Sequence, residues 1–384
     1  MDAEAAGAKR KGHLFVVEQD QKWLEELEAQ AGEHGIPTLG YGLLTDAMDT
    51  LKSEKSIALV LGDSKGQNLT NKVTRIRDDE DLSGMPVIGF VKDQNSEDLK
   101  KAFEIGLDDF VAHATIQSFS RKLSALLQEK DWDAVRAPSG TALLASSDRI
   151  ERISWARILR RIGFDVHFAS DQEEFSAGMD GSRSFRIVIS NEELWTQKLG
   201  EKMQQAFSKE DVSVSPMIIL HNGSGVSGAA ASLTGHPKVA AFNKKHPAEN
   251  ANHVINRLMA PPQSELRRSP RLNYSVPVSY RIGDSAEDLL GYSWNINKTG
   301  IFIRTLNPAP AGSALTMEFR PPSGRGTVIV EGQSVWCQRL GLKRMMFSPS
   351  GMGVVFTKVP LADSAALEAG YNELLRISYD REGA

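Results

Sequence analysis

The sequence predicts a multidomain chain in which two doubly wound α/β domains precede a small β-barrel with a C-terminal helix. Three observations lead to this fold class. Short apolar runs alternate with helical stretches over roughly the first 130 residues, which favours a parallel sheet covered on both faces. The same rhythm returns about 130 residues further on, as a duplication of architecture without close similarity of sequence. From residue 265 the runs become short and β-rich, with turn residues between them at barrel-like spacing.

The first α/β domain is expected over residues 12–130. Its strands are apolar runs of strand length at residues 13–17, 57–61, 87–91 and 110–111. Apolar side chains at helical spacing predict a helix around residues 23–31, and a closing helix includes residues 123–127. Residues 1–11 carry charges and no apolar core, so we expect a short disordered tail and not a secretory signal.

The second α/β domain is expected over residues 141–260, after a linker at residues 129–140. Its strands are predicted at residues 143–145, 185–189, 217–220 and 239–242, and its helices at 150–162 and 252–259. In the first of these helices, the predicted apolar side consists of Ile150, Ile153, Ile158 and Ile162. A second linker, residues 259–264, contains two prolines and ends the α/β region.

The third domain, residues 265–384, has a different character. Strands are predicted at residues 276–280, 300–304, 314–319, 326–330 and 353–359, followed by a helix near 364–378. This part has 14 Lys+Arg against 11 Asp+Glu, a balance of +3, whereas the rest of the chain has 31 against 38, a balance of −7. All eight histidines precede residue 254, so the barrel has none for acid–base chemistry.

Composition excludes several classes of protein. The chain has 45 Lys+Arg and 49 Asp+Glu, and a net charge of −4 weighs against a protein that coats a nucleic acid polymer. The single cysteine, Cys337, excludes intramolecular disulfides and Cys-rich zinc sites. No segment approaches the ~20 apolar residues of a membrane helix. We therefore expect a cytoplasmic protein without membrane insertion.

Each α/β half resembles the receiver domain of response regulators, a five-stranded, flavodoxin-like fold. In that family two acidic residues after strand one hold Mg²⁺ together with a phosphoacceptor Asp at the end of strand three. A Thr or Ser ends strand four, and a Lys near strand five contacts the phosphoryl group. The resemblance therefore implies phosphoryl reception only where these groups are present.

The first half keeps only part of this set. Strand one ends at Glu18 and Asp20, and Asp63 falls near the phosphoacceptor position. Val91 stands where the hydroxyl is needed, and His113 stands near the position of the Lys. We interpret this half as a pseudo-receiver that serves dimerisation or partner docking, with phosphorylation of Asp63 as the alternative.

The second half departs further from the pattern. The acceptor position reads Asn191, and an Asn amide cannot be phosphorylated in this chemistry. Strand four ends at His221, and Lys245 or His246 is expected at the position of the Lys. We therefore predict a second pseudo-receiver.

Residues 223–228 form a literal G-x-G-x-x-G. The dinucleotide fingerprint requires this motif in the first βα turn, with an acidic residue about 20 positions on. Here it follows a late strand, and residues 242–245 (FNKK) stand at that distance. A loop of the pseudo-receiver is the favoured interpretation, and nucleotide binding here is the alternative.

Two short motifs mark the third domain. Residues 267–271 (RRSPR) contain R-x-x-x-R just before the first barrel strand. Pro270 and the preceding prolines disfavour helix, so these arginines are expected on an extended arm. The second motif, residues 295–300 (NINKTG), leads into the strand IFIRT.

Together the two motifs resemble the PilZ domain, the cyclic di-GMP receptor module, whose pattern is R-x-x-x-R followed by D/N-x-S-x-x-G. The resemblance covers about residues 265–378. Guanidinium groups suit this dianionic ligand because they make bidentate contacts to phosphate and to the guanine edge, and stack on purines. The resemblance implies that Arg267 and Arg271 clamp phosphate and guanine. The full set of implied ligand residues is Arg267, Arg268, Arg271, Asn295, Asn297 and Gly300.

Asn297 is the one departure from this pattern, because it stands where the family has Ser. An amide still donates and accepts hydrogen bonds, but it is longer. Gly300 is expected to allow close approach of the backbone or a positive φ. The alternative is a basic arm and an ordinary turn on a barrel that binds no ligand.

The leading hypothesis is a non-catalytic signalling receptor that binds cyclic di-GMP, uses no cofactor or metal, and acts through an unidentified protein partner or a homodimer. Ordering of the arm at a domain junction would change interdomain packing. The alternatives are a scaffold without ligand and a phosphorelay response regulator using Asp63. An enzyme is the weakest hypothesis, because the barrel shows no paired carboxylates, nucleophile elbow or metal-ligand spacing, and no catalytic residue is predicted.

Overall fold

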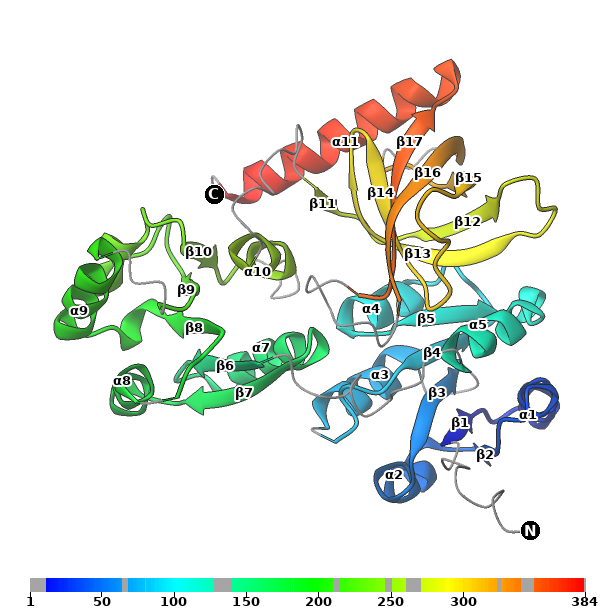
Figure 1. Cartoon of the computed structure of the whole chain (residues 1–384), viewed down its shortest axis with the longest axis horizontal. Helices are drawn as coiled ribbons and strands as arrows, with labels where there is room; N and C mark the ends of the chain where they lie inside the picture. The colour runs from blue at the N-terminus through cyan, green and yellow to red at the C-terminus, as the bar shows by residue number, and fades with distance from the viewer. Residues whose placement is uncertain are drawn as a thin grey trace, which may run out of the picture. The chain divides into compact units, whose positions relative to one another are not determined.

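The computed structural model describes residues 12–63, 68–79, 81–127, 140–181, 183–209, 214–245, 251–259, 271–322, 326–339 and 349–382. Figure 1 shows the labelled elements in chain order, from the blue N-terminal strands to the red C-terminal helix. The predicted tail at residues 1–11 lies outside the described residues. Within the described part, none of the helices has the length and apolar character needed to cross a bilayer.

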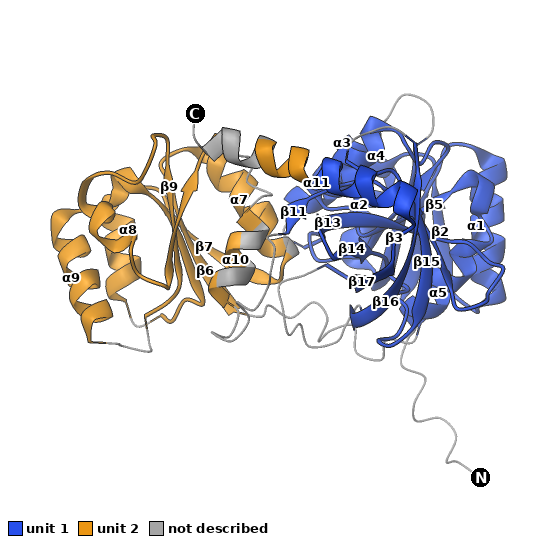
Figure 2. Ribbon diagram, turned by 90° about the horizontal axis from the view of Figure 1, so that it is seen from above, with its two compact units in different colours: residues 1–135, 271–342, 349–371 blue, residues 136–270, 343–348, 372–384 orange. Residues whose placement is uncertain are grey.

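The chain divides into two compact units, drawn in different colours in Figure 2. Unit 1 contains residues 1–135, 271–342 and 349–371, and therefore joins the first α/β domain to most of the barrel domain. Unit 2 contains residues 136–270, 343–348 and 372–384, and therefore holds the second α/β domain.

The first α/β domain has a five-stranded parallel sheet in the order β2-β1-β3-β4-β5. This order is that of the flavodoxin-like fold. Its apolar residues form two clusters, one on each face of the sheet. The elements are β1 (His13–Val17), α1 (Gln21–Glu33), β2 (Thr38–Tyr41), α2 (Leu44–Ser53), β3 (Ser56–Gly62), α3 (Leu69–Asp78), β4 (Val87–Val91), α4 (Glu97–Ile105), β5 (Asp109–Ala112) and α5 (Ser118–Leu127), with a 3₁₀ turn, η1 (His113–Thr115), before α5.

The second α/β domain repeats this topology in the order β10-β9-β8-β6-β7. Its last crossover is the 3₁₀ helix η3 in place of an α-helix. The elements are β6 (Gly140–Ala145), α7 (Arg149–Arg161), β7 (Phe164–Ala169), α8 (Gln172–Asp180), β8 (Ile187–Asn191), η2 (Glu192–Leu194), α9 (Gln197–Ser208), β9 (Met217–His221), η3 (Gly228–Leu233), β10 (Val239–Asn243) and α10 (Ala251–Met259).

The predicted apolar side of α7 is wrong at two positions. Ile150 and Ile153 are 75% and 43% exposed, whereas Ile158 and Ile162 are buried as expected. At 3.6 residues per turn, both exposed residues lie roughly opposite Trp155, which is buried. The side of the helix that carries Trp155 therefore packs against the domain. The prediction was wrong because it took the isoleucines alone to mark the buried side.

The barrel domain closes six antiparallel strands in the order β13-β12-β15-β16-β17-β14, with β14 paired back to β13. The short strand β11 adds to β13. The predicted fold class is thus confirmed. The elements are β11 (Leu272–Asn273), β12 (Pro277–Ile282), β13 (Leu289–Asn297), β14 (Gly300–Arg304), β15 (Ala314–Phe319), β16 (Val328–Gln338), β17 (Gly351–Lys358) and α11 (Leu361–Glu382).

Candidate functional site

The second predicted motif forms the tip of the β13–β14 hairpin. Asn297 ends β13, Gly300 begins β14, and the two residues are directly paired. The residues between them make the turn. The hairpin therefore places residues 297–300 of the motif at a rim of the barrel.

β11 brings the first motif to the same place. Leu272 pairs with Ile296, and Asn273 pairs with Asn295, in an antiparallel register. Continuing this register by one residue puts Arg271 beside Asn297. The pairing of β11 with β13 therefore brings the end of the first motif to the strand that carries Asn295 and Asn297, although the two motifs are separated along the chain. Arg267 and Arg268 lie outside the described residues.

Asn295 is buried, with 2% of its surface exposed. Its Oδ1 accepts no hydrogen bond from any residue that the structure describes. An unsatisfied buried carbonyl costs about 1–3 kcal/mol. The side-chain oxygen of Asn295 is therefore a buried acceptor without a donor among the described residues.

Asn297 takes part in the turn itself. Its Oδ1 accepts hydrogen bonds from the backbone N–H of Thr299 at 3.1 Å and from the Thr299 hydroxyl at 3.4 Å. This is the local side-chain capping typical of Asn in turns. Its amide nitrogen is the group that remains suited to donate to a ligand.

Gly300 serves close approach rather than a positive φ. A Cβ at this position would lie 2.3 Å from the carbonyl oxygen of Val354 in β17. Gly300 is not among the glycines with positive φ. Of the two expected roles, the structure therefore shows the first.

A cavity of about 230 Å³ lies between the hairpin and α11. Lys298 of the hairpin is 3.6 Å from Glu368 of α11, and its ammonium lies 5.8 Å from the ring centre of Tyr371. The helix is thus tied to the hairpin by a partly exposed ion pair beside the cavity. The lining residues are Ile296, Asn297, Lys298, Phe356, Val359, Ser364, Leu367 and Glu368.

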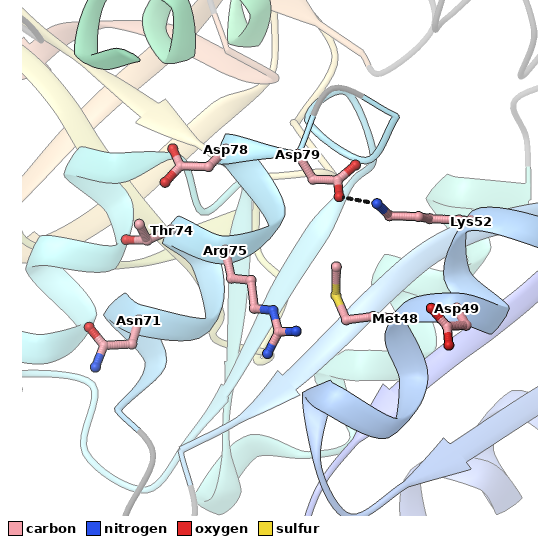
Figure 3. Close-up of a pocket in the computed structure, with 8 residues that line it drawn as sticks. All are labelled: Met48, Asp49, Lys52, Asn71, Thr74, Arg75, Asp78 and Asp79. Atoms are coloured by element: carbon pink, nitrogen blue, oxygen red, sulfur yellow. Dashed lines mark ion pairs between the residues drawn. The ribbon is translucent and has the colours of Figure 1, made fainter. Parts of the chain in front are cut away.

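A larger cleft, of about 710 Å³, lies between α2 and α3 (Figure 3). Lys52 and Asp79 face each other across it, with 2.6 Å between their charged atoms, and this hydrogen-bonded pairing raises the pKa of Lys52. Arg75 and two further aspartates, Asp49 and Asp78, also line it. The mixed charges favour no single class of ligand, and none of the described residues of the two motifs lines the cleft.

The carboxyl edge of the first sheet carries the predicted receiver residues. Asp63 accepts a hydrogen bond from the backbone N–H of Lys92 at 2.9 Å, and its Oδ1 is 4.0 Å from His113 Nε2. His113 stacks on Phe90, and burial lowers its pKa, so the imidazole is neutral at pH 7. Val91 is buried and offers no hydroxyl.

Lys72, a buried lysine near Glu18 and Asp63, was not predicted from the sequence. The residue is 3% exposed, and its ammonium donates to the Gly62 carbonyl at 2.7 Å. Burial lowers its pKa, while the nearby charges of Glu18 and Asp63 oppose this shift. No sequence signal marks Lys72, because it comes from α3 and not from a strand end.

The acidic edge of the first sheet contains a cation supplied by the chain itself. Lys72 already places a positive charge beside Glu18 and Asp63. Across the described ranges, no three His, Cys, Asp or Glu residues gather closely enough to hold a metal ion. The carboxylates are therefore balanced from within the chain.

The second sheet has a comparable internal counter-ion at its carboxyl edge. Lys244 lies 3.5 Å from Glu151 and 3.9 Å from Glu193. The sequence placed Lys245 or His246 here. The structure instead puts Lys244 in this position, and His246 lies outside the described residues. Asn191, at the acceptor position, is fully buried and donates to Glu193.

The G-x-G-x-x-G segment is a loop that leads into η3. The backbone N–H and hydroxyl of Ser227 both donate to the carboxylate of Glu192, at 2.6 and 2.8 Å. These bonds hold the pKa of Glu192 below its ordinary value, although burial opposes them. Since a protein carboxylate already takes these donors, the geometry favours the loop interpretation over a phosphate site.

Comparison with known proteins supports the domain assignment. Residues 265–373 match the family model of the PilZ domain, and the predicted PilZ domain is thereby confirmed. No curated protein matches the chain.

Solved structures with similar parts were also found. A probable two-component system response regulator/GGDEF domain protein is 17% identical, covering 65% of this chain and 98% of that chain with a TM-score of 0.32. The PilZ domain of YcgR from Escherichia coli, with c-di-GMP, is 16% identical, covering 30% and 97% with a TM-score of 0.23. HP1043, an orphan response regulator of H. pylori, is 19% identical, covering 30% and 96% with a TM-score of 0.27. At these values the similarities carry no functional argument.

Proposed function

We propose, from the premise that residues 265–373 form a PilZ domain, that this chain is a non-catalytic receptor for cyclic di-GMP. The protein would act in the cytoplasm and pass on ligand occupancy through protein contacts of its pseudo-receiver domains. The observation that carries the proposal is the match to the PilZ family over the region that contains both motifs.

The arrangement of the described motif residues supports this ligand. The β11–β13 register, extended by one residue, would put Arg271 beside Asn297, which pairs with Gly300. A guanidinium next to an amide can bind a phosphate and a base edge at once. We propose Arg271 as a clamp for phosphate and guanine, and Asn295 and Asn297 as base-pocket residues.

The arginine arm completes the proposed site. Arg267 and Arg268 precede Arg271 in the R-x-x-x-R motif. Each charge-assisted hydrogen bond to a desolvated dianion is worth about 1.5–3 kcal/mol. We propose that Arg267 shares the clamp with Arg271 and that Arg268 lies beside them.

Calorimetric titration of the full chain with cyclic di-GMP tests the proposal. We expect micromolar or tighter binding, and we expect Arg267→Ala and Arg271→Ala each to weaken it by about tenfold or more, from the loss of one such bond. Arg281→Ala is the matched control, because Arg281 is exposed on β12 of the same barrel and pairs with Asp288. Cyclic di-AMP, which lacks the guanine edge, should not compete.

Two outcomes would contradict the proposal. If the Arg271→Ala variant binds cyclic di-GMP with the affinity of the wild-type chain, the arm is not the clamp. Absence of binding by the wild-type chain would instead favour the alternative of a scaffold without ligand.

A further inference from the structure

The barrel covers an edge of the first α/β sheet that would otherwise face solvent. β5 is the last strand of that sheet, and among the strands that the structure describes it pairs with β4 alone. Unpaired strand edges are normally blunted or covered in native proteins. Here all four residues of β5 are buried, and β13 of the barrel lies beside β5 in Figure 1.

Asp109 is the polar centre of this interface. It is fully buried, and its Oδ2 lies 2.7 Å from the ammonium of Lys122 in α5. The same oxygen accepts from the Thr305 hydroxyl at 3.1 Å and from the Leu306 N–H at 2.8 Å, both in the barrel domain. Lys122 in turn donates to the Leu290 carbonyl of β13 at 3.1 Å. One buried ion pair thus holds groups from both domains.

The apolar part of the interface centres on Phe103 of α4. The ring of Tyr292 stacks on it at 4.0 Å and 8°. Arg304 donates through Nη1 to the Phe103 carbonyl at 2.7 Å, and its guanidinium lies 5.8 Å from the Phe103 ring centre. Tyr292 and Leu290 belong to the same apolar cluster as Phe103. The two domains therefore share a core.

Strands β13 and β14 carry Tyr292 and Arg304, which contact Phe103. The same two strands carry Asn295, Asn297 and Gly300 of the candidate ligand site. Tyr292 pairs with Arg304 at the base of the β13–β14 hairpin, and Asn297 pairs with Gly300 at its tip. At about 3.3 Å per residue, the four steps from Gly300 to Arg304 span roughly 13 Å. We infer that this hairpin couples cyclic di-GMP at its tip to the docking of the first α/β domain at its base. The inference rests on the proposed function.

The direction of coupling follows from preorganisation. Docking fixes the base of the hairpin through the Tyr292 ring and the Arg304 guanidinium. A hairpin that is already fixed loses less conformational entropy when it binds a ligand. Loosening the interface therefore weakens ligand binding, and by reciprocity the ligand strengthens docking.

Phe103→Leu in the full chain tests this coupling. Phe103 belongs to α4 of the first α/β domain, and the change keeps an apolar residue in the core while removing the stack on Tyr292. We expect the Kd for cyclic di-GMP to rise about fivefold, the lower end of typical coupling between sites. The matched control is Phe15→Leu, at a fully buried phenylalanine of β1 in the same domain, which should leave the Kd unchanged.

Hydrogen exchange of the wild-type chain gives a second readout that needs no variant. Cyclic di-GMP should slow exchange in α4 and β5 as well as at the hairpin. Thr305→Val removes one hydrogen bond to Asp109 and should reduce this ligand-induced protection of α4 and β5. It serves as the test variant in place of Phe103→Leu if the latter does not fold.

The outcomes separate the two proposals. Unchanged or tighter binding by a folded Phe103→Leu variant, or ligand protection confined to the hairpin, would overturn the coupling while leaving the receptor intact. A wild-type chain that binds no cyclic di-GMP would overturn the proposed function, and the coupling with it.

Discussion

Removing the ammonium of Lys122 should open the edge of the first sheet. The Lys122 side chain is 4% exposed and that of Asp109 is 0% exposed, so Lys122→Met leaves a buried carboxylate without its cation. Breaking a buried pair in this way typically costs 3–5 kcal/mol. The Leu290 carbonyl also loses its donor from Lys122.

The expected loss lies at the lower end of this range. Asp109 Oδ2 keeps its hydrogen bonds from the Thr305 hydroxyl and the Leu306 N–H, and these charge-assisted bonds still hold the carboxylate. We therefore expect about 3 kcal/mol, which corresponds to exchange faster by more than about a hundredfold. Hydrogen exchange of the β5 amides, residues 110–112, measures this local opening.

Lys358→Met is the control for this prediction. It makes the same substitution in the same unit, but Lys358 is 69% exposed and pairs with Glu331, which is 52% exposed. Surface pairs of this kind are worth less than about 1 kcal/mol, so exchange in β5 should stay close to wild type. Equal exchange rates in Lys122→Met and wild type would refute the reasoning, because the barrel donors alone would then be sufficient for Asp109.

Four further predictions follow from single positions. Asp63 should not bind beryllofluoride, since Val91 and neutral His113 replace the groups that receivers use; stoichiometric modification that Asp63→Asn abolishes would contradict this. Asn297→Ala should weaken cyclic di-GMP binding by about 1 kcal/mol while Asn297→Ser preserves or improves it, and tighter binding by the Ala variant would show that Asn297 blocks the pocket. Gly300→Ala should cost about 1–3 kcal/mol in a denaturation experiment, because its Cβ meets a backbone carbonyl at 2.3 Å. Because burial lowers the pKa of His113 below 6.5, its contribution to stability should be complete above pH 6.5 and fall as the pH drops below it; His113→Phe should flatten that decline in denaturation midpoints measured between about pH 5 and about pH 7.5.

Apolar runs in β1, β4 and β14, and alternating apolar residues in β15, made these strands predictable from sequence. β1, β4, β14 and β15 have the predicted bounds, because a strand buried on both faces or packed in a barrel needs apolar residues at nearly every inward position. The short edge strand β2 was missed, since its four residues are only half-buried or exposed and carry no such run. β13 was missed because polar residues and a glycine interrupt its apolar pattern, although eight of its nine residues are buried.

The residues proposed for the ligand site were chosen from sequence alone, because arginines and amides at fixed spacing are a local property of the chain. Their proximity was not predictable in this way. It depends on the pairing of β11 with β13, in which Leu272, the residue after Arg271, pairs with Ile296. The role of Gly300 also depends on a distant element, since the carbonyl that excludes a side chain belongs to Val354 of β17.

By itself, the sequence determined the fold class, the order of the domains and the presence of a PilZ domain. Only the tertiary structure decided that Lys72 would balance the acidic edge of the first sheet, and that Asp109 would meet Thr305, a residue 196 positions away. Local patterns record whether a side chain is apolar or charged. They do not record which distant backbone will cover a sheet edge, because that choice depends on the shape and burial of both partners once each has folded.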